Sequence, residues 1–237
     1  EILICVYVCH PSMANNEISG PVVATFLARY FGKIKKKYSI RFIFVPETIG
    51  AIFYISKNLK KLKKNVIAAY NLSCIGDERA YSYIPTKYGN TLSDIAVKQA
   101  FKELKIKFKS YSFLDRGSNE RQFNSPYIDI PMAVLMRSSF FFPEYHTSLD
   151  NFDVVTEKGL RGGYKIVKKA IEIIQTKDIP ITKVYCEPMM SKRKLQITRS
   201  TGPVAKNSLH LRDFLTYADG KNDLEKIRKL IKVSKKK

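Results

Sequence analysis

Short apolar runs alternate with longer amphipathic segments along the first three quarters of the chain. Runs such as residues 2–9 and 39–46 have the length of buried strands, and each is followed by a segment with apolar residues at helical spacing. Strands that are regularly separated by helices predict crossover units and a mostly parallel sheet covered on both faces. The sequence therefore predicts a three-layer α/β fold. The expected strands are 2–9, 39–46, 65–76, 108–114 and 129–138, and the expected helices are 19–34, 50–64, 90–106 and 156–175.

Serine, glycine and proline residues add expectations about two of these helices. Ser19 or Gly20 is expected to cap the helix over 19–34, with Pro21 in its first turn. Gly162 and Gly163 are expected to weaken the first half of the helix over 156–175, because glycine loses more backbone entropy in a helix than other residues do.

The alternating pattern ends near Lys183. Residues 186–203 are irregular and basic, and residues 211–233 have the pattern of two short helices around a turn. We therefore expect an α/β domain over 1–182, followed over 183–237 by a linker and a small, mainly helical appendage. No apolar run approaches the roughly 18–20 residues that cross a bilayer, so no membrane span is expected.

Composition adds a strong positive charge to this picture. The formal net charge is +21, with lysines spread over several expected solvent faces. This spread favours a lysine-rich solvated surface over a nucleic-acid site, because no RNP-like aromatic motif or zinc-finger spacing accompanies it. The four cysteines form no C-x-x-C pair, which is typical of reduced thiols and predicts a cytoplasmic protein. Nothing in the sequence sets the oligomeric state.

Polar clusters follow the expected strands, where ligands bind in parallel α/β sheets. They cover residues 10–20, 46–50, 116–123 and 143–151, and they contain His10, His146 and Glu47. Two imidazoles with an oxygen ligand are typical of a catalytic zinc site, and a nearby carboxylate can act as general base on a zinc-activated water. A histidine after a strand also has an ordinary structural explanation, and a glutamate before a helix is favoured by the helix dipole.

Five short motifs occur in an order that resembles a known family. After His10 come ANNEISG (14–20), PETIG (46–50), LSCIG (72–76), GSNERQF (117–123) and YHTSLDN (145–151). This order is similar to that of zinc-dependent aminopeptidases of the exopeptidase α/β fold. It most closely resembles a bacterial branch of aminopeptidase-like proteins with an inserted domain and a C-terminal winged helix, associated with polysaccharide biosynthesis.

The resemblance implies a metal-dependent aminopeptidase-like hydrolase that acts on a peptide or an amide-containing small molecule. It also implies that the chain is a fragment, which lacks N-terminal strands and the inserted domain and ends in an incomplete winged helix over 183–237. The opening residue, Glu1, lies directly before a strand-like run, which agrees with that expectation.

The resemblance also gives roles to single residues. His10 and His146 match the two metal-binding histidines, and Glu47 matches the catalytic glutamate. Asn16 stands where an aspartate bridges two metal ions, and Thr48 and Ser73 stand at two other acidic positions of the family. Hydroxyl and amide groups are weak zinc ligands, so we expect one zinc ion.

The third protein ligand remains open between two neighbours, Asn16 and Glu17, with Asp77 and Glu144 as more distant candidates. Glu17 is also a candidate for binding substrate. Asn119, like Asn16, carries an amide where an acid is expected in the family. Amides at both positions are what a catalytically impaired relative would show, so the alternative function is a protein that binds a small molecule or peptide without turnover.

Two further sets of residues are candidates around this site. Asn119 and Arg121 are expected to bind substrate, because a guanidinium can hold a carboxylate through two hydrogen bonds, although Arg121 has an equal alternative in a structural ion pair with Glu120. Asp150 resembles a carboxylate that orients a metal-binding imidazole, or it caps the helix near Thr156.

Overall fold

The computed structural model describes residues 1–140, 142–195 and 206–234. The chain divides into two units, Glu1–Thr176 and Lys177–Lys237.

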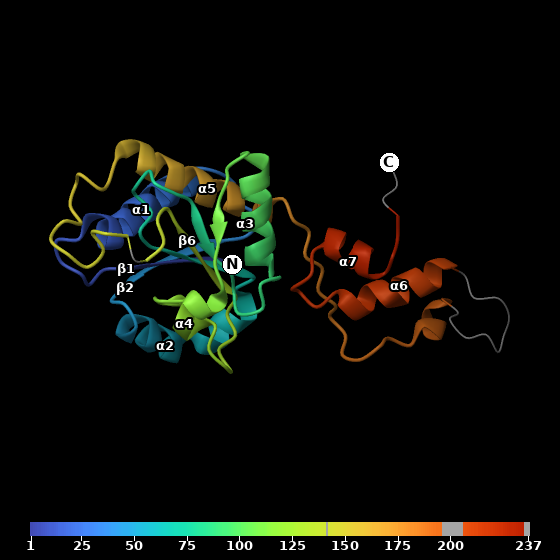
Figure 1. Cartoon of the computed structure of the whole chain (residues 1–237). Helices are drawn as coiled ribbons and strands as arrows, with labels where there is room; N and C mark the ends of the chain where they lie inside the picture. The colour runs from blue at the N-terminus through green and yellow to red at the C-terminus, as the bar shows by residue number, and fades with distance from the viewer. Residues whose placement is uncertain (141, 196–205, 235–237) are drawn as a thin grey trace. The chain divides into compact units, whose positions relative to one another are not determined.

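A mixed six-stranded sheet forms the centre of the first unit (Figure 1). The strands lie in the order β2-β1-β3-β6-β4-β5, and every neighbouring pair is parallel except β4 and β6. The mostly parallel sheet expected from the sequence is therefore confirmed. The strands are β1 (Ile2–Tyr7), β2 (Ile40–Val45), β3 (Ala68–Leu72), β4 (Ser82–Ile84), β5 (Lys109–Ser110) and β6 (Met132–Met136).

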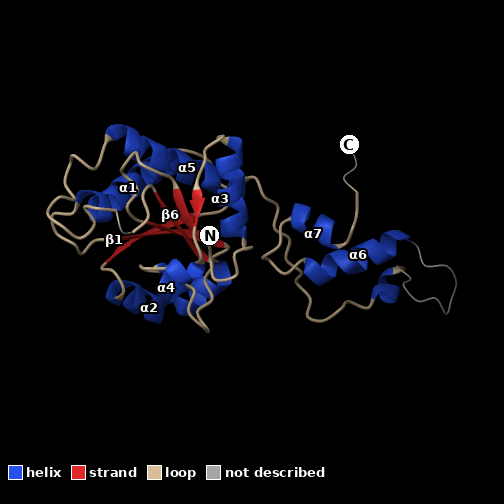
Figure 2. Ribbon diagram, in the orientation of Figure 1, coloured by secondary structure: helices blue, strands red, loops and turns tan. Residues whose placement is uncertain are grey.

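Helices cover both faces of this sheet, as Figure 2 shows by secondary structure. On one face lie α1, α3 and α5, and on the other lie α2 and α4 (Figure 1). All residues of β1 are buried, as expected for a strand in the middle of a covered sheet. The helices of this unit are α1 (Ser19–Gly32), α2 (Ile49–Asn65), α3 (Leu92–Glu103), α4 (Glu120–Phe123) and α5 (Glu157–Gln175).

The strand expected over 108–114 is much shorter in the structure. Only Lys109–Ser110 pairs with the sheet, and both residues are exposed at its edge. A short 3-10 helix, Phe113–Asp115, follows, and the Ser112 hydroxyl caps it by accepting a hydrogen bond from Leu114 N–H at 3.1 Å. The polar Ser112 therefore starts a helical turn where the apolar pattern predicted a strand.

The start of α1 also differs from the expected cap at Ser19 or Gly20. A π-helical turn, η1 (Ala14–Ile18), leads directly into α1, and Ile18 has helical backbone angles. Ser19 is buried, and its hydroxyl donates to Asn15 O and accepts from Ile75 N–H. The expected cap is therefore wrong, and Ser19 instead ties α1 to the loop after β3.

The glycines of α5 allow close packing and do not interrupt the helix. The helix is continuous over Glu157–Gln175 and is capped by Thr156, whose hydroxyl accepts from Gly159 N–H at 2.9 Å. A Cβ on Gly163 would lie 2.5 Å from Ile75 Cγ1 and 2.6 Å from Ile75 O. Glycine is needed at this position because the helix backbone approaches the loop after β3. The expected weakening of this half of the helix stays a prediction.

The second unit contains one 3-10 helix and two short α-helices within its described residues. They are η3 (Met190–Arg193), α6 (Lys206–Tyr217) and α7 (Leu224–Leu230). Asp223 caps α7 by accepting from Lys226 N–H at 2.7 Å, and its other oxygen pairs with Lys177 at 3.0 Å. The two helices expected around the turn near 218–223 are present, whereas part of the irregular basic segment lies outside the described residues. The incomplete winged helix stays a prediction.

Among the described residues, no helix is both long enough and apolar enough to cross a membrane. All four cysteines are free thiols, two of them buried and two exposed.

Candidate functional site

The candidate site lies beyond the carboxyl ends of four parallel strands. His10 follows β1, Glu47 follows β2, Ser73 follows β3, and His146 lies in the long loop after β6. Because β1, β2, β3 and β6 run in the same direction, these loops all emerge at one edge of the sheet. Sheet topology therefore brings together residues that are more than a hundred positions apart.

His10 is the centre of this group. Its Nε2 lies 3.9 Å from Glu47 Oε2, and its ring stacks against that of His146 with 5.3 Å between ring centroids. The His146 ring also stacks against that of Tyr145, with a centroid distance of 3.8 Å. The structure thus places three predicted site residues, His10, Glu47 and His146, beside one another.

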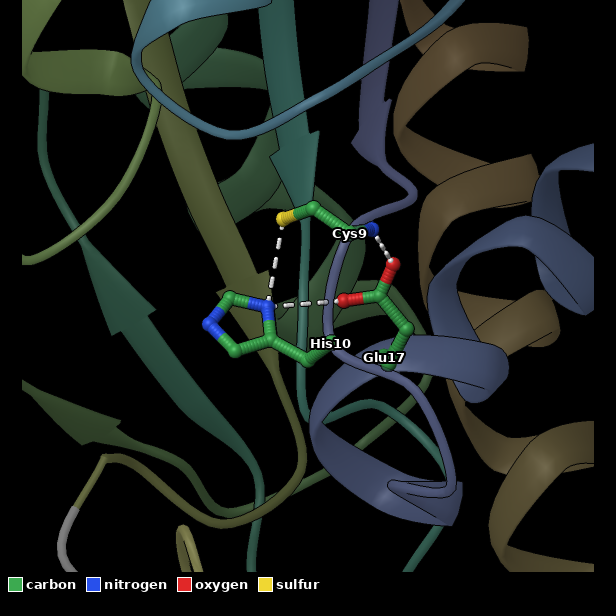
Figure 3. A group of neighbouring side chains, drawn as sticks. All are labelled: Cys9, His10 and Glu17. Atoms are coloured by element: carbon green, nitrogen blue, oxygen red, sulfur yellow. Dashed lines mark hydrogen bonds and ion pairs between the residues drawn. The ribbon is translucent and has the colours of Figure 1, made fainter.

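A carboxylate and a thiol lie on the other side of the same imidazole (Figure 3). His10 Nδ1 lies 3.0 Å from Glu17 Oε2 and 3.2 Å from Cys9 Sγ. Glu17 is buried, and its second oxygen accepts a hydrogen bond from Cys9 N–H. Burial raises the pKa of the Cys9 thiol above its ordinary value. Cys9 was not predicted as a site residue, although its position directly before His10 was a usable signal.

Asn16 lies on the π-helical turn η1 and is buried. Its Nδ2 donates to the Tyr7 hydroxyl at 3.0 Å, which lies 2.6 Å from the Ser73 hydroxyl. Its Oδ1 is also buried and has no hydrogen-bond partner among the described residues. Buried polar atoms nearly always have a partner, so this unpaired oxygen is a candidate ligand atom.

Asp150 holds the turn that carries Asn16. Its two carboxylate oxygens accept backbone N–H bonds from Asn15 at 2.7 Å and from Asn16 at 2.9 Å. It thus satisfies the amide donors that a helix start leaves without intrahelical partners. The cap of α5 is Thr156, so the alternative role for Asp150 as that cap is wrong. Its expected role in orienting the His146 ring stays a prediction.

Asn119 and Arg121, both expected to bind substrate, contact the turn after Glu47. Asn119 Oδ1 accepts from Thr48 N–H at 2.8 Å, and Arg121 Nη2 donates to the Thr48 hydroxyl at 2.8 Å. Thr48 has φ 58°, which is unfavourable for a β-branched residue and costs about 1–3 kcal/mol. These contacts hold the strained turn, and through it they position Glu47.

The more distant ligand candidates are engaged elsewhere. Asp77 is buried and accepts from the Ser138 hydroxyl at 2.7 Å and from Ser138 N–H at 2.9 Å. Glu144 forms a two-bond pair with Arg79, at 2.7 and 2.8 Å. The third metal ligand therefore remains between Asn16 and Glu17.

Comparison with known proteins gives the family of the chain. Residues 1–177 match the family described as "Domain of unknown function (DUF4910)". The chain belongs to this family. A relative from Clostridium acetobutylicum, named as a polysaccharide biosynthesis protein with aminopeptidase-like domain, is 40% identical over 194 residues, which are 81% of this chain and 44% of that protein.

Solved structures agree with this assignment of the DUF4910 chain. A crystal structure described as a peptidase from Clostridium acetobutylicum has a TM-score of 0.74 and 35% identity, covering 98% of this chain and 52% of that one. The zinc aminopeptidase BSAP from Bacillus subtilis has a TM-score of 0.63 and 18% identity, covering 77% of this chain and 48% of that one. The predicted aminopeptidase-like family and α/β fold are confirmed. The chain spans about half the length of these relatives.

Proposed function

We propose that the chain carries the active site of an aminopeptidase-like amide or peptide hydrolase that uses one zinc ion. The observation that carries this proposal is the approach of Glu47 to within 3.9 Å of His10 Nε2, beside the stacked rings of His10 and His146. A carboxylate next to two imidazoles at the open edge of a sheet is the donor set of a hydrolytic zinc site with a general base.

The chemistry of the available side chains supports one zinc ion in preference to two. His10, His146 and the free Oδ1 of Asn16 supply two imidazoles and one oxygen donor. Thr48 and Ser73 stand at the two other positions where the resemblance implies acids, and both already have partners within the chain. The Thr48 hydroxyl accepts from Arg121, and the Ser73 hydroxyl is hydrogen-bonded to the Tyr7 hydroxyl. A second ion would therefore have to displace existing hydrogen bonds and would meet only neutral oxygens.

Each residue of the site has a separate task in hydrolysis. When bound, zinc supplies a Lewis acid for the substrate carbonyl and lowers the pKa of water. Glu47, with about a quarter of its side chain exposed, takes the proton from the attacking water and returns it to the leaving amine. Asn119 and Arg121 fix the turn that aims this carboxylate, and Glu17 orients the His10 ring through Nδ1.

The proposed substrate is a peptide or a small molecule with an amide bond, and the proposed location is the cytoplasm. The relative named as a polysaccharide biosynthesis protein supports an amide carried by a sugar as one such substrate. A nucleic-acid partner is not part of this proposal.

A second candidate function is binding without turnover. Amides at Asn16 and Asn119 replace two expected acids, and the Asn119 oxygen is engaged by Thr48 N–H at 2.8 Å. A pocket that keeps its shape but holds metal weakly would bind an amide ligand without hydrolysing it. Measurable release of N-terminal residues, lost on Glu47→Gln, excludes this candidate.

The two functions are separated by metal analysis and a peptide panel on the full chain. Glu47→Gln is expected to keep zinc and lower the rate by about 10²–10⁴-fold, because it removes the general base. His146→Ala is expected to lose zinc and activity together. The third histidine, His210, lies in the second unit and offers a matched control. His210→Ala should change neither the zinc content nor the activity. Zinc content unaffected by His146→Ala would contradict the proposed ligand set.

A further inference from the structure

Three different donor groups meet on the Nδ1 side of His10 (Figure 3). Cys9 Sγ, His10 Nδ1 and a Glu17 carboxylate oxygen all lie within 4.8 Å of one another. Two of these distances, 3.2 Å from Nδ1 to the thiol sulfur and 3.0 Å from Nδ1 to Oε2, match the spacing of ligands that share one ion at about 2.0–2.3 Å. The Cys9 thiol has no role in the proposed hydrolase.

The geometry differs from that of a nucleophilic cysteine. In a thiol–imidazole–carboxylate triad, the thiol and the carboxylate contact opposite ring nitrogens, so that a proton can move across the imidazole. Here the sulfur and the Glu17 carboxylate both face Nδ1, and the carboxylate on the Nε2 side, Glu47, lies 3.9 Å away, beyond hydrogen-bond distance. One nitrogen cannot relay a proton between the sulfur and the Glu17 carboxylate, whereas a cation placed among sulfur, nitrogen and carboxylate would be bonded by all three.

We propose that Cys9, His10 and Glu17 form a binding site for one thiophilic divalent cation, of which zinc is the commonest in proteins. A thiolate, an imidazole and a carboxylate are all established zinc ligands, and the sulfur favours soft and borderline ions over magnesium or calcium. Binding releases the thiol proton and requires the neutral imidazole to carry its proton on Nε2.

The surrounding structure holds these donors in place before an ion arrives. Glu17 is buried and receives Cys9 N–H on its second oxygen, while Cys9 Sγ accepts from Glu47 N–H at 3.3 Å. Cys9 itself is exposed, so an ion can enter from solvent and keep a fourth position open to water. Donors fixed by backbone contacts lose little conformational entropy on binding.

This site is separate from that of the proposed hydrolase, but the two sites compete for the His10 ring. The hydrolase site lies on the side of Nε2, toward Glu47, and includes His146. A neutral imidazole carries one proton, so an ion on Nδ1 and an ion on Nε2 exclude each other. Substitution of Cys9 and of His146 therefore reports on different sites.

The test is titration of the reduced, metal-free full chain with Co²⁺, followed by near-ultraviolet absorption. Thiolate bound to Co²⁺ gives an intense sulfur-to-metal charge-transfer band that oxygen and nitrogen ligands do not give. We expect a band that saturates at one equivalent, disappears in Cys9→Ser, and shifts to at least about tenfold weaker binding in Glu17→Gln. Cys186→Ser, which removes the other exposed thiol, and His146→Ala should both keep it.

A band that is absent in the wild-type chain, survives Cys9→Ser or disappears in Cys186→Ser or His146→Ala would overturn the proposal. Circular dichroism of each variant separates loss of the site from loss of the fold. A second measurement needs no substitution: Cd²⁺ should slow alkylation of Cys9 by iodoacetamide while leaving Cys186 reactive, as seen by peptide mass spectrometry. Equal alkylation of both thiols with and without Cd²⁺ would also overturn it.

Discussion

At the scale of single residues, an amide and a carboxylate stand at two neighbouring positions, Asn16 and Glu17. Asn16 has a neutral Oδ1 without a partner among the described residues, at a position where the sequence resemblance implies an aspartate, and the Glu17 carboxylate lies at His10 Nδ1. A neutral amide oxygen binds zinc more weakly than a carboxylate does. We therefore predict that the proposed zinc site is sensitive to the charge at position 16.

Asn16→Asp is expected to raise zinc affinity by tenfold or more, equivalent to about 1.4 kcal/mol, because it adds a negative charge at a buried oxygen that has no other partner. Competition with a chromophoric chelator measures the change. Asn151→Asp is the matched control, since it adds the same charge at an exposed position near His146. Equal effects of both substitutions would show that only long-range charge is involved, and no gain for Asn16→Asp would remove Asn16 from the ligand set.

Glu120 gives a pH-dependent prediction at the same scale. Burial raises its pKa, although N–H groups of Ser118 and Gly117 and the Asn71 amide partly oppose this. The folded chain therefore binds this proton more tightly than the unfolded chain does. The contribution is present below the unfolded pKa of about 4.3 and is lost as pH rises through the folded value.

Glu120→Gln should remove this pH dependence and keep the fold. Asn71 Nδ2 donates to Glu120, and Asn71 Oδ1 is buried without a partner among the described residues, so a glutamine amide can donate to that oxygen once the Asn71 amide turns over. We expect the stability of the variant relative to wild type to increase from about pH 4 toward pH 7, as measured by urea denaturation. Glu144→Gln is a control with the opposite sign, because the hydrogen bond from Arg79 lowers the pKa of Glu144. Its stability relative to wild type should decrease as the pH rises. Parallel pH profiles for wild type and Glu120→Gln would contradict the prediction.

At the scale of elements, hydrophobic periodicity predicted the long segments and failed on the short ones. The buried strand β1 and the helix α5 follow from it, whereas β4 has only three residues and the π-helical turn η1 has no local signal. The sequence alone also offered no reason for the glycine at position 163, which is needed because α5 lies close to Ile75 there. Local propensity does not contain that contact.

The candidate site was likewise predictable in part from the sequence. Parallel strands bring their carboxyl ends to one edge, so the sequence could predict that His10, Glu47 and His146 converge. It could not predict that Asn119 and Arg121 bond Thr48, because those contacts depend on side-chain directions in a turn with positive φ. Topology can be predicted from pattern, but the partner of each polar atom requires the packed structure.

The turn η1 should depend on one distant carboxylate. Asp150 accepts both Asn15 N–H and Asn16 N–H, so Asp150→Asn leaves one amide hydrogen facing an NH₂ group and should cost about 1–3 kcal/mol of unfolding free energy. Urea denaturation measures this loss, and zinc affinity should fall with it because Asn16 moves. Asp153→Asn, an exposed neighbour in the same loop, is the control. A loss shared equally by both variants would show that the carboxylate has no special role.

At the scale of the whole molecule, the chain is built as two units, and the first contains every residue of the candidate site. The family match ends at residue 177, one residue after the end of this unit. The unit has a sheet covered on both faces and a buried core of its own. A segment with these properties can fold by itself.

A fragment of residues 1–176 is therefore expected to unfold cooperatively and to bind zinc as the full chain does. Circular dichroism should be used to follow urea unfolding, because the chain has no tryptophan. A fragment of residues 1–168 is the matched control. It lacks the end of α5 with Ile171 and Ile174, both fully buried, and losing about 1.5–3 kcal/mol for each side chain should leave it unfolded. If 1–176 fails to fold while the full chain folds, the second unit must supply part of its stability. If 1–168 also folds, the end of α5 with its buried isoleucines is not essential for the fold.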